Sequence, residues 1–171
     1  MSSQHPVDVL IRELIATRRA ATAGEVAAIV ARMASAPFDE RAARVRIAER
    51  GTTYLGHTLS ADEPRLIYHL IKRVVIEGQW SLGTTAADYL ADLRLAIRIP
   101  TARLLVYERR GGTLTASIAP TSDVLGNARR GPNSLPYLLV VYSADRGAII
   151  TGYQFSNWES IRLSEEVVWL T

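Results

Sequence analysis

The sequence predicts an α+β fold, in which N-terminal helices precede a four- or five-stranded antiparallel sheet with a helix packed on one face. Two observations carry this prediction. The spacing of apolar residues changes from helical to extended near residue 102. The stretch from Tyr137 to Phe155 then consists of two strand-like segments around a short polar connection, which is typical of a β-hairpin. With 171 residues, of which 48% are apolar, the chain is long enough to bury one well-packed core.

Three helices are predicted in the first third of the chain. Apolar residues three and four positions apart predict an amphipathic helix over 7–17. Thr22 and Glu25 match the capping-box pattern at the start of a second helix over 23–34. A third helix with a thin apolar side is predicted over 39–50, because a proline precedes it and a glycine follows it.

The short segment after the third helix is the best candidate for a boundary. We therefore predict an N-terminal helical region over 1–56 and an α+β domain over 57–171. Ser60 is expected to cap a long helix over 61–77, because a glutamate stands three positions later and a glycine follows the end. A further helix is predicted over 85–97, which a proline closes.

Five segments beyond residue 102 have the composition and spacing of strands. Their meander order predicts a single antiparallel sheet. Gly111 and Gly112 predict a two-residue turn between the first two strands. The five segments are 104–108, 114–118, 138–142, 148–155 and 167–170.

The hairpin allows a prediction of strand register. The segment 137–142 is apolar at every position, so both of its faces should be covered and it should be a central strand. The five-residue polar connection after it predicts antiparallel pairing, with Leu139 opposite Thr151 and Val141 opposite Ile149.

Basic residues concentrate in the middle of the chain. Residues 94–130 contain seven arginines and two acidic residues. Residues 1–93 contain eleven basic and eleven acidic residues, and residues 131–171 contain two basic and four acidic residues. A phosphate-bearing partner would be attracted to such a patch, although a solvated arginine-rich surface explains it equally well. The candidate RNA-binding residues of this segment are Arg109, Arg110, Arg129 and Arg130, which we expect to line or rim one cleft. Lys72, outside the segment, is a further candidate RNA-binding residue.

Several classes of site and location are excluded by what the sequence lacks. The absence of cysteine excludes disulfides, thiolate metal sites and cysteine nucleophiles. The three histidines lack metal-binding spacing, and no nucleotide-binding loop is present, so we predict neither a metal nor a cofactor. No run approaches the roughly 18 apolar residues of a membrane span, and no signal-peptide pattern opens the chain. We therefore expect no membrane partner and a cytoplasmic location.

The candidate catalytic residues come from the helix predicted over 61–77 and from the hairpin. His69 and Arg73 stand one turn apart on the side of this helix that we expect to be exposed, with Lys72 beside them. Histidine can transfer a proton near neutral pH, and a guanidinium can hold a phosphate bidentately. Thr151 and Tyr153 would place two hydroxyls on one face of the sheet. These groups suit metal-independent RNA cleavage by attack of the 2′-hydroxyl, although a solvated helix face is the commoner explanation.

The helix segment HLIKR, the segment GQWSLGTTAADYL and the late strand AIITGYQFS together resemble the barnase-EndoU-colicin-RelE group of small RNases, particularly the toxin domains. The resemblance covers about residues 57–171. It implies a helix-borne His69, Lys72 or Arg73 that faces Thr151 and Tyr153, RNA endonuclease activity without a cofactor, and an antitoxin or immunity protein as partner. The sequence departs from the group in having no histidine in the sheet, and the helices of 1–51 have no counterpart in it.

The competing interpretation is a non-enzymatic interaction module, such as the neutralising partner of a toxin or a small assembly subunit. Trp80, Trp158 and Trp169 could form an apolar contact surface, and the alanine-rich N-terminal helices could form a homodimer. A small-molecule binding domain is a third possibility, with only the abundance of tyrosine and tryptophan in its favour.

Overall fold

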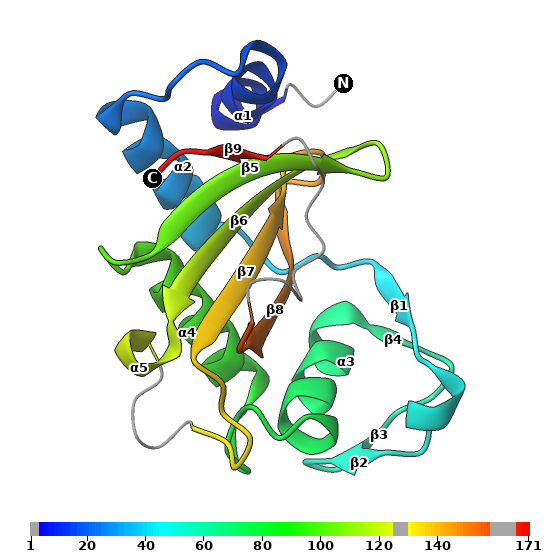
Figure 1. The fold of residues 1–171 in the computed structure, drawn as a ribbon. Helices are drawn as coiled ribbons and strands as arrows, with labels where there is room; N and C mark the ends of the chain where they lie inside the picture. The colour runs from blue at the N-terminus through cyan, green and yellow to red at the C-terminus, as the bar shows by residue number, and fades with distance from the viewer. Residues whose placement is uncertain (1–3, 125–129, 158–166) are drawn as a thin grey trace.

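Figure 1 shows the computed structural model, which describes residues 4–124, 130–157 and 167–171. A five-stranded antiparallel sheet has the strand order β8-β7-β6-β5-β9. Helices α1, α2 and α4 lie on one face of the sheet, and α3 lies beside its β8 edge (Figure 1). The α+β prediction, with N-terminal helices before an antiparallel sheet, is confirmed.

All five predicted strands are present. The turn between the first two consists of Arg110 and Gly111, with φ of 52° and 76°, and Gly112 already pairs with Arg109. The predicted turn at Gly111 and Gly112 was therefore wrong by one residue. The strands are β5 Arg103–Arg109, β6 Gly112–Pro120, β7 Tyr137–Ser143, β8 Ala148–Phe155 and β9 Val168–Trp169.

Strand β7 lies between β6 and β8 and is buried along most of its length, so its prediction as a central strand is confirmed. Its pairing with β8 is antiparallel, as predicted, but the register differs. Leu139 lies opposite Tyr153 and Val141 opposite Thr151, so the predicted pairs were wrong by two residues. A bulge next to Val141 accounts for one residue of this offset, and a connection one residue shorter than predicted accounts for the other. Because the bulge breaks the alternation of side chains, Ile149 packs with the helices, whereas Ile150, Tyr153 and Phe155 lie on the opposite face.

Helices α1 Pro6–Thr17, α2 Ala23–Ser35 and α4 Ala86–Arg98 confirm three of the predicted helices. α2 and α4 both begin with a capping box, in which a threonine hydroxyl and an acidic side chain satisfy free backbone N–H groups. α4 packs across β6 and β7, while α1 packs against β5 and β6. The fully buried side chains of these three helices include Ile11, Leu14, Ile29, Met33 and Leu93.

The helix predicted over 39–50 is absent. Its thin apolar side offers little to bury as a helix, and the segment instead forms the short strand β1 Ala42–Arg44 and the 3₁₀ turn η1 Ile47–Glu49. β1 pairs with β4 Asp62–Pro64. Between them, β2 Thr53–Tyr54 and β3 His57–Thr58 form a small hairpin.

The helix predicted over 61–77 begins later and changes character midway. α3 runs Arg65–Ile71, and η2 Lys72–Ile76 continues it as a π-helix, in which the Glu77 N–H donates to the Lys72 carbonyl at 2.8 Å. Ser60 does not cap it, because the Ser60 backbone N–H donates to the Glu63 side chain before β4 instead. Among the strands of the large sheet, α3 packs mainly on β8, so α4 is the helix that crosses the face.

The core has two parts, one on each face of the sheet. The larger part joins α1, α2, α3 and α4 to the helical face, and the smaller part lies on the opposite face around Leu105, Tyr107 and Phe155. The larger part continues across residue 56, and the division into 1–56 and 57–171 stays a prediction. Within the described ranges, no helix is both long and apolar enough to span a membrane.

Candidate functional site

Strand β8 is the edge of the sheet, and its outward backbone groups are paired with groups from three other segments. Ile149 exchanges hydrogen bonds with the chain beside Phe38: its N–H donates to a carbonyl at 2.9 Å, and its carbonyl accepts an N–H at 2.8 Å. Gln79 pairs with the backbone of Gln154 through its side-chain amide, at 2.8 and 3.1 Å. The Gly152 carbonyl accepts from side chains of the two helices nearby. This pairing protects an edge that would otherwise be open to other strands.

The residues predicted to be catalytic meet at this edge. The Arg73 guanidinium donates from Nε to the Gly152 carbonyl at 3.0 Å and from Nη2 to the Thr151 hydroxyl at 3.1 Å. His69 Nδ1 lies 3.3 Å from both the Thr151 Oγ1 and the Arg73 Nη2. The Arg73 Cζ lies 5.2 Å from the centre of the Tyr153 ring. We call His69, Arg73, Thr151 and Tyr153 the edge cluster.

The π-helix places Arg73 at the edge. The Arg73 carbonyl accepts the N–H of Gln79 at 2.7 Å. This bond extends the widened helical turn to Gln79, the residue whose side chain pairs with Gln154. Tyr89 of α4 donates its hydroxyl to the Gly152 carbonyl at 2.6 Å, beside the Arg73 bond. Helix α3 with its π-helical end therefore docks on β8 through polar groups.

Two residues of the edge cluster, His69 and Arg73, are buried, which contradicts the prediction that they lie on an exposed helix face, while Thr151 and Tyr153 are half-buried. His69 is 9% exposed and Arg73 is 6% exposed. A single apolar stripe was assumed for this helix, but α3 packs on more than one side. The rings of Phe38 and Tyr68 each lie 5.7 Å from the His69 ring. Arg73 is also paired with the Glu77 carboxylate, so its charge is already compensated.

Burial changes the acid–base properties of His69. Desolvation, together with the positive charges of Arg73, Arg65 and Lys72, lowers the pKa of His69 to about 3. The imidazole is therefore neutral at pH 7. It can accept a hydrogen bond or a proton, but it lacks the second ring proton that a general acid donates to a leaving group.

Lys72, a predicted RNA-binding residue, contacts another part of the chain. Its ammonium lies 3.7 Å from the Glu49 carboxylate and 5.6 Å from the centre of the Tyr68 ring. Burial lowers the pKa of Lys72. Two of the other predicted residues, Arg109 and Arg110, lie at the β5–β6 turn.

Arginines from three segments surround a cavity of about 470 Å³. Arg65 comes from the start of α3, Arg109 and Arg110 from the β5–β6 turn, and Arg146 from the β7–β8 turn. We call this cavity the arginine hollow. Sequence reasoning missed Arg65 and Arg146, since neither lies in the basic segment of the chain. The helix predicted over 61–77 placed Arg65 on its outer side, and the hairpin placed Arg146 in its polar connection, but neither residue was predicted to belong to a site.

The carboxylates around the arginine hollow are already engaged. Asp39, which is 5% exposed, is shared by Arg146 at 2.7 Å, Arg65 at 3.5 Å and Arg41 at 3.6 Å. One carboxylate cannot neutralise three guanidiniums, so positive charge is left over at this wall.

Asp145, on another wall of the hollow, is held in the same way. One oxygen lies 2.6 Å from the Arg12 guanidinium, and the other accepts the Thr113 backbone N–H at 2.9 Å. The Arg12 and Thr113 hydrogen bonds lower the pKa of Asp145 even though desolvation opposes them. The hollow therefore has an excess of positive charge and presents hydrogen-bond donors, the two features that bind phosphate.

The remaining predicted residues do not join the hollow. Arg130 lines a separate cavity beside Thr121 and Ser134, and its backbone bridges to Trp80. Arg129 and Trp158 lie outside the described residues. The prediction that Arg109, Arg110 and Arg130 share one cleft is therefore wrong for Arg130. Of the tryptophans offered as a contact surface, Trp80 is fully buried, whereas Trp169 is 42% exposed.

No family model, no curated protein and no solved structure matches this chain. The residues of 4–124, 130–157 and 167–171 contain no group of three or more histidine and acidic side chains placed to hold a metal ion.

Proposed function

We propose that this protein binds single-stranded RNA through the arginine hollow. The observation that carries the proposal is the convergence of four arginines from three separate segments on one cavity whose carboxylates are already paired. A cluster of arginines within a single helix would be a common surface feature. Arginines brought together by folding make a concave site of excess positive charge.

RNA is favoured over other anions for two reasons. Guanidinium groups bind phosphate oxygens bidentately, and each neutralised phosphate releases counterions, so several arginines bind a polyphosphate better than a single anion. A flexible single strand can also bend into a cavity of about 470 Å³, whereas a duplex contacts extended surfaces. The resemblance to small RNases points to the same class of ligand.

Fluorescence anisotropy with a labelled, unstructured oligoribonucleotide at low salt tests this proposal. Arg65, which lies on the hollow, and Arg130, which lies on a different cavity, form a matched pair. We expect Arg65→Gln to weaken binding and Arg130→Gln to leave it unchanged within about twofold. Absence of binding by the wild type at low salt, or equal losses from both variants, would refute the proposal.

A second candidate function, metal-independent RNA cleavage, is favoured by the meeting of the four edge-cluster residues within hydrogen-bond and ring-contact distance. The state of His69 limits the chemistry. Because the imidazole is neutral and buried, it could act only as a proton acceptor, and only if the substrate or a movement of α3 opened the cluster. Arg73 would have to exchange Glu77 for the scissile phosphate.

Cleavage is tested by incubating the protein with mixed single-stranded RNA in EDTA. If the edge cluster is catalytic, Thr151→Val and His69→Gln should each lower the rate by the roughly 10²–10⁴ expected for a lost acid–base or orienting group, with RNA affinity retained. If the wild-type protein leaves the RNA intact, or if the variants cleave at the wild-type rate, the edge cluster is not catalytic and RNA binding is the function that remains. An antitoxin or immunity protein is the expected partner only if cleavage is found.

The alternative of a non-enzymatic interaction module predicts self-association or protein capture instead of RNA binding. The apolar side chains of α1 and α2 that could have formed a homodimer, such as Ile11, Leu14 and Ile29, are fully buried within the chain. A dimer through these helices would therefore have to use their outer faces. The observations favour RNA, and light scattering of the purified protein would report a dimer.

A further inference from the structure

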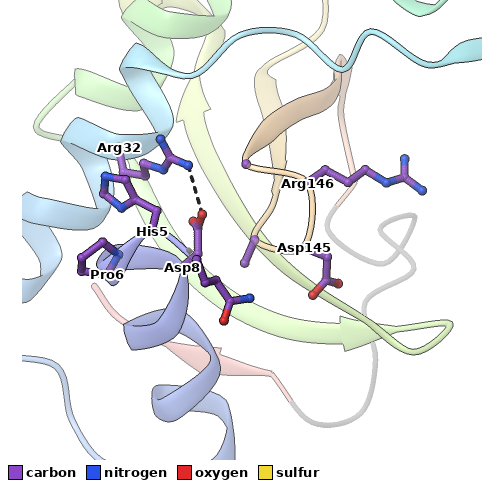
Figure 2. Close-up of a pocket in the computed structure, with 9 residues that line it drawn as sticks. His5, Pro6, Asp8, Arg32, Asp145 and Arg146 are labelled. Carbon is purple, nitrogen blue, oxygen red and sulfur yellow. Dashed lines mark hydrogen bonds and ion pairs between the residues drawn. The ribbon is translucent and has the colours of Figure 1, made fainter. Parts of the chain in front are cut away.

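A second and larger cavity lies on the other side of the β7–β8 turn from the arginine hollow. It has a volume of about 750 Å³ and is bounded by the start of α1, by α2 and by the turn (Figure 2). Asp145 and Arg146 line both cavities, so the two adjoin at this turn. We call the second one the N-terminal cavity.

The charges of the N-terminal cavity balance, unlike those of the arginine hollow. Its innermost carboxylate, Asp8, is 3% exposed and accepts from the Tyr142 hydroxyl at 2.6 Å and from Arg32 at 3.0 Å. Figure 2 shows the Arg32 guanidinium directed at Asp8. Two carboxylates and two guanidiniums therefore line this cavity, which gives hydrogen-bonding capacity without net charge.

The mouth of the N-terminal cavity offers groups that a ligand can reach. His5 is exposed, and its Nδ1 accepts the Val7 backbone N–H at 3.1 Å, so the neutral ring carries its proton on Nε2 as a donor. The side-chain amide of Gln4 adds a donor and an acceptor beside it. Each Asp145 oxygen accepts only one bond in the described chain and keeps a further lone pair.

The β7–β8 turn, whose Asp145 and Arg146 line both cavities, requires glycine at its end. Gly147 has a φ of +62°, and a Cβ at this position would lie 2.8 Å from the Arg32 Nη2. The end of the turn therefore passes close to Arg32 on the side of the N-terminal cavity.

We propose that the N-terminal cavity binds the nucleoside portion of a nucleotide whose phosphate lies in the arginine hollow. This inference rests on the proposed function and adds a subsite to it. A nucleotide combines an anionic phosphate with an uncharged base and ribose rich in donors and acceptors. The two adjoining cavities have the same division, one cationic and one neutral and polar. Recognition of the base adds selectivity that phosphate contacts alone do not give.

Calorimetry with two probes tests the subsite. Adenosine 5′-monophosphate and ribose 5-phosphate share a phosphate and a sugar and differ in the base. We expect the wild type to bind adenosine 5′-monophosphate about tenfold more tightly, the equivalent of one or two hydrogen bonds. A Gln4→Ala, His5→Ser double variant should lose most of this difference and keep its affinity for ribose 5-phosphate.

The variant is chosen to preserve the fold. Serine at position 5 can still cap α1, but it is too short to reach a ligand in the cavity. His57→Ser, which removes a half-exposed histidine on β3, is the matched control and should behave as the wild type. Equal wild-type affinity for the two probes, or a difference that survives in the double variant, would overturn the subsite.

A tetranucleotide of adenosine separates this inference from the proposed function. Tighter binding of the tetranucleotide than of the monophosphate supports both the subsite and RNA as the ligand. Equal affinity, with the monophosphate still preferred over ribose 5-phosphate, supports the subsite and refutes RNA as the ligand in favour of a free nucleotide. Binding of the tetranucleotide without a preference between the two small probes refutes the subsite and retains RNA binding.

Discussion

The edge cluster and the arginine hollow both gather polar side chains around α3, yet they differ in what those side chains still have to offer. In the edge cluster, Arg73 is buried and its hydrogen bonds go to Gly152, Thr151 and Glu77. Beside the hollow, Arg65 and Arg146 share the Asp39 carboxylate with Arg41, and Arg109 and Arg110 add further positive charge to its walls. The charge of Arg73 is paired within the chain, whereas the hollow is left with excess positive charge.

The types of residue that meet at a site therefore do not by themselves identify a binding site. Histidine, arginine, threonine and tyrosine suggest chemistry wherever they meet, but a group of them whose guanidinium is buried and paired also serves to close a sheet edge. A concave group of cations with too few carboxylates has no such structural role. We therefore expect the edge cluster to contribute mainly to stability and the hollow to ligand binding.

The largest effect is expected from Arg73→Met. The change leaves the Glu77 carboxylate without its guanidinium partner and removes one of the two hydrogen bonds that the Gly152 carbonyl accepts, so we expect the free energy of unfolding to fall by about 3–5 kcal/mol in urea denaturation. Arg109→Met, at the hollow, should change it by about 0.5 kcal/mol or less. A cost below about 1 kcal/mol for Arg73→Met would show that the edge cluster is not structural.

The next effect concerns RNA affinity. Reversing both Arg109 and Arg110 to glutamate replaces two attractions by two repulsions at the hollow, and we expect affinity at low salt to fall about 100-fold. Arg130→Glu changes charge on a different cavity and should cost about threefold or less. If Arg130→Glu weakens binding as much as a single reversal at the hollow, net charge rather than the hollow determines affinity.

The low pKa of His69 predicts a loss of stability in mild acid. His69 takes up its proton near pH 6.5 in the unfolded chain and near pH 3 in the folded one. Between these values the unfolded state holds more protons, so stability rises with pH and falls as the solution is acidified.

From pH 7 to pH 5 this residue should account for a loss of about 2 kcal/mol, measured by urea denaturation at both values. His69→Gln should remove most of that loss. The range from pH 7 to pH 5 excludes most of the protonation of the carboxylates, which occurs mainly below pH 5. An equally acid-sensitive His69→Gln protein would mean that the histidine is protonated in the native state, as a catalytic acid would be.

The smallest effect is on salt dependence. Each phosphate neutralised by the hollow contributes roughly −0.7 to the slope of log affinity against log salt for a single strand. Arg110→Gln should therefore reduce the steepness of that slope by about 0.7, and Arg130→Gln should leave it unchanged. Identical slopes for the wild type and Arg110→Gln would exclude Arg110 from contact with phosphate.

The strands and three of the helices were predictable because local signals and tertiary packing agree. Thr22 and Glu25 form the capping box that their spacing indicated, and the apolar run 137–142 is an interior strand. The register of the hairpin was wrong by two residues because the sequence revealed neither the bulge at Ile150 nor the four-residue length of the connection. The prediction of a helix over 39–50 was wrong because the proline and glycine around that segment also fit a loop with a short strand.

The candidate site was predictable only in part. The resemblance to small RNases implied that Arg73 faces Thr151, and the two side chains do meet, but nothing in the sequence predicted that Arg73 is buried. A helical period of 3.6 residues puts Arg73 on the outer face of an isolated helix, whereas the actual π-helix turns it toward β8. Arg65 and Arg146 stand 81 positions apart in the sequence, and only the folded chain brings them to one carboxylate.

The way in which the β8 edge is covered also determines how this protein aggregates when it is destabilised. Its outer edge is covered by the Gln79 amide, the Arg73 guanidinium, the Tyr89 hydroxyl and a backbone bridge beside Phe38, not by another strand. The cover that Arg73 and Gln79 provide is lost if the segment of α3 and η2 lifts away. The N–H and C=O groups of β8 that Arg73 and Gln79 had paired would then face solvent and could pair with the same strand of another molecule. Heat or acid that loosens α3 should therefore produce aggregates before the rest of the sheet unfolds.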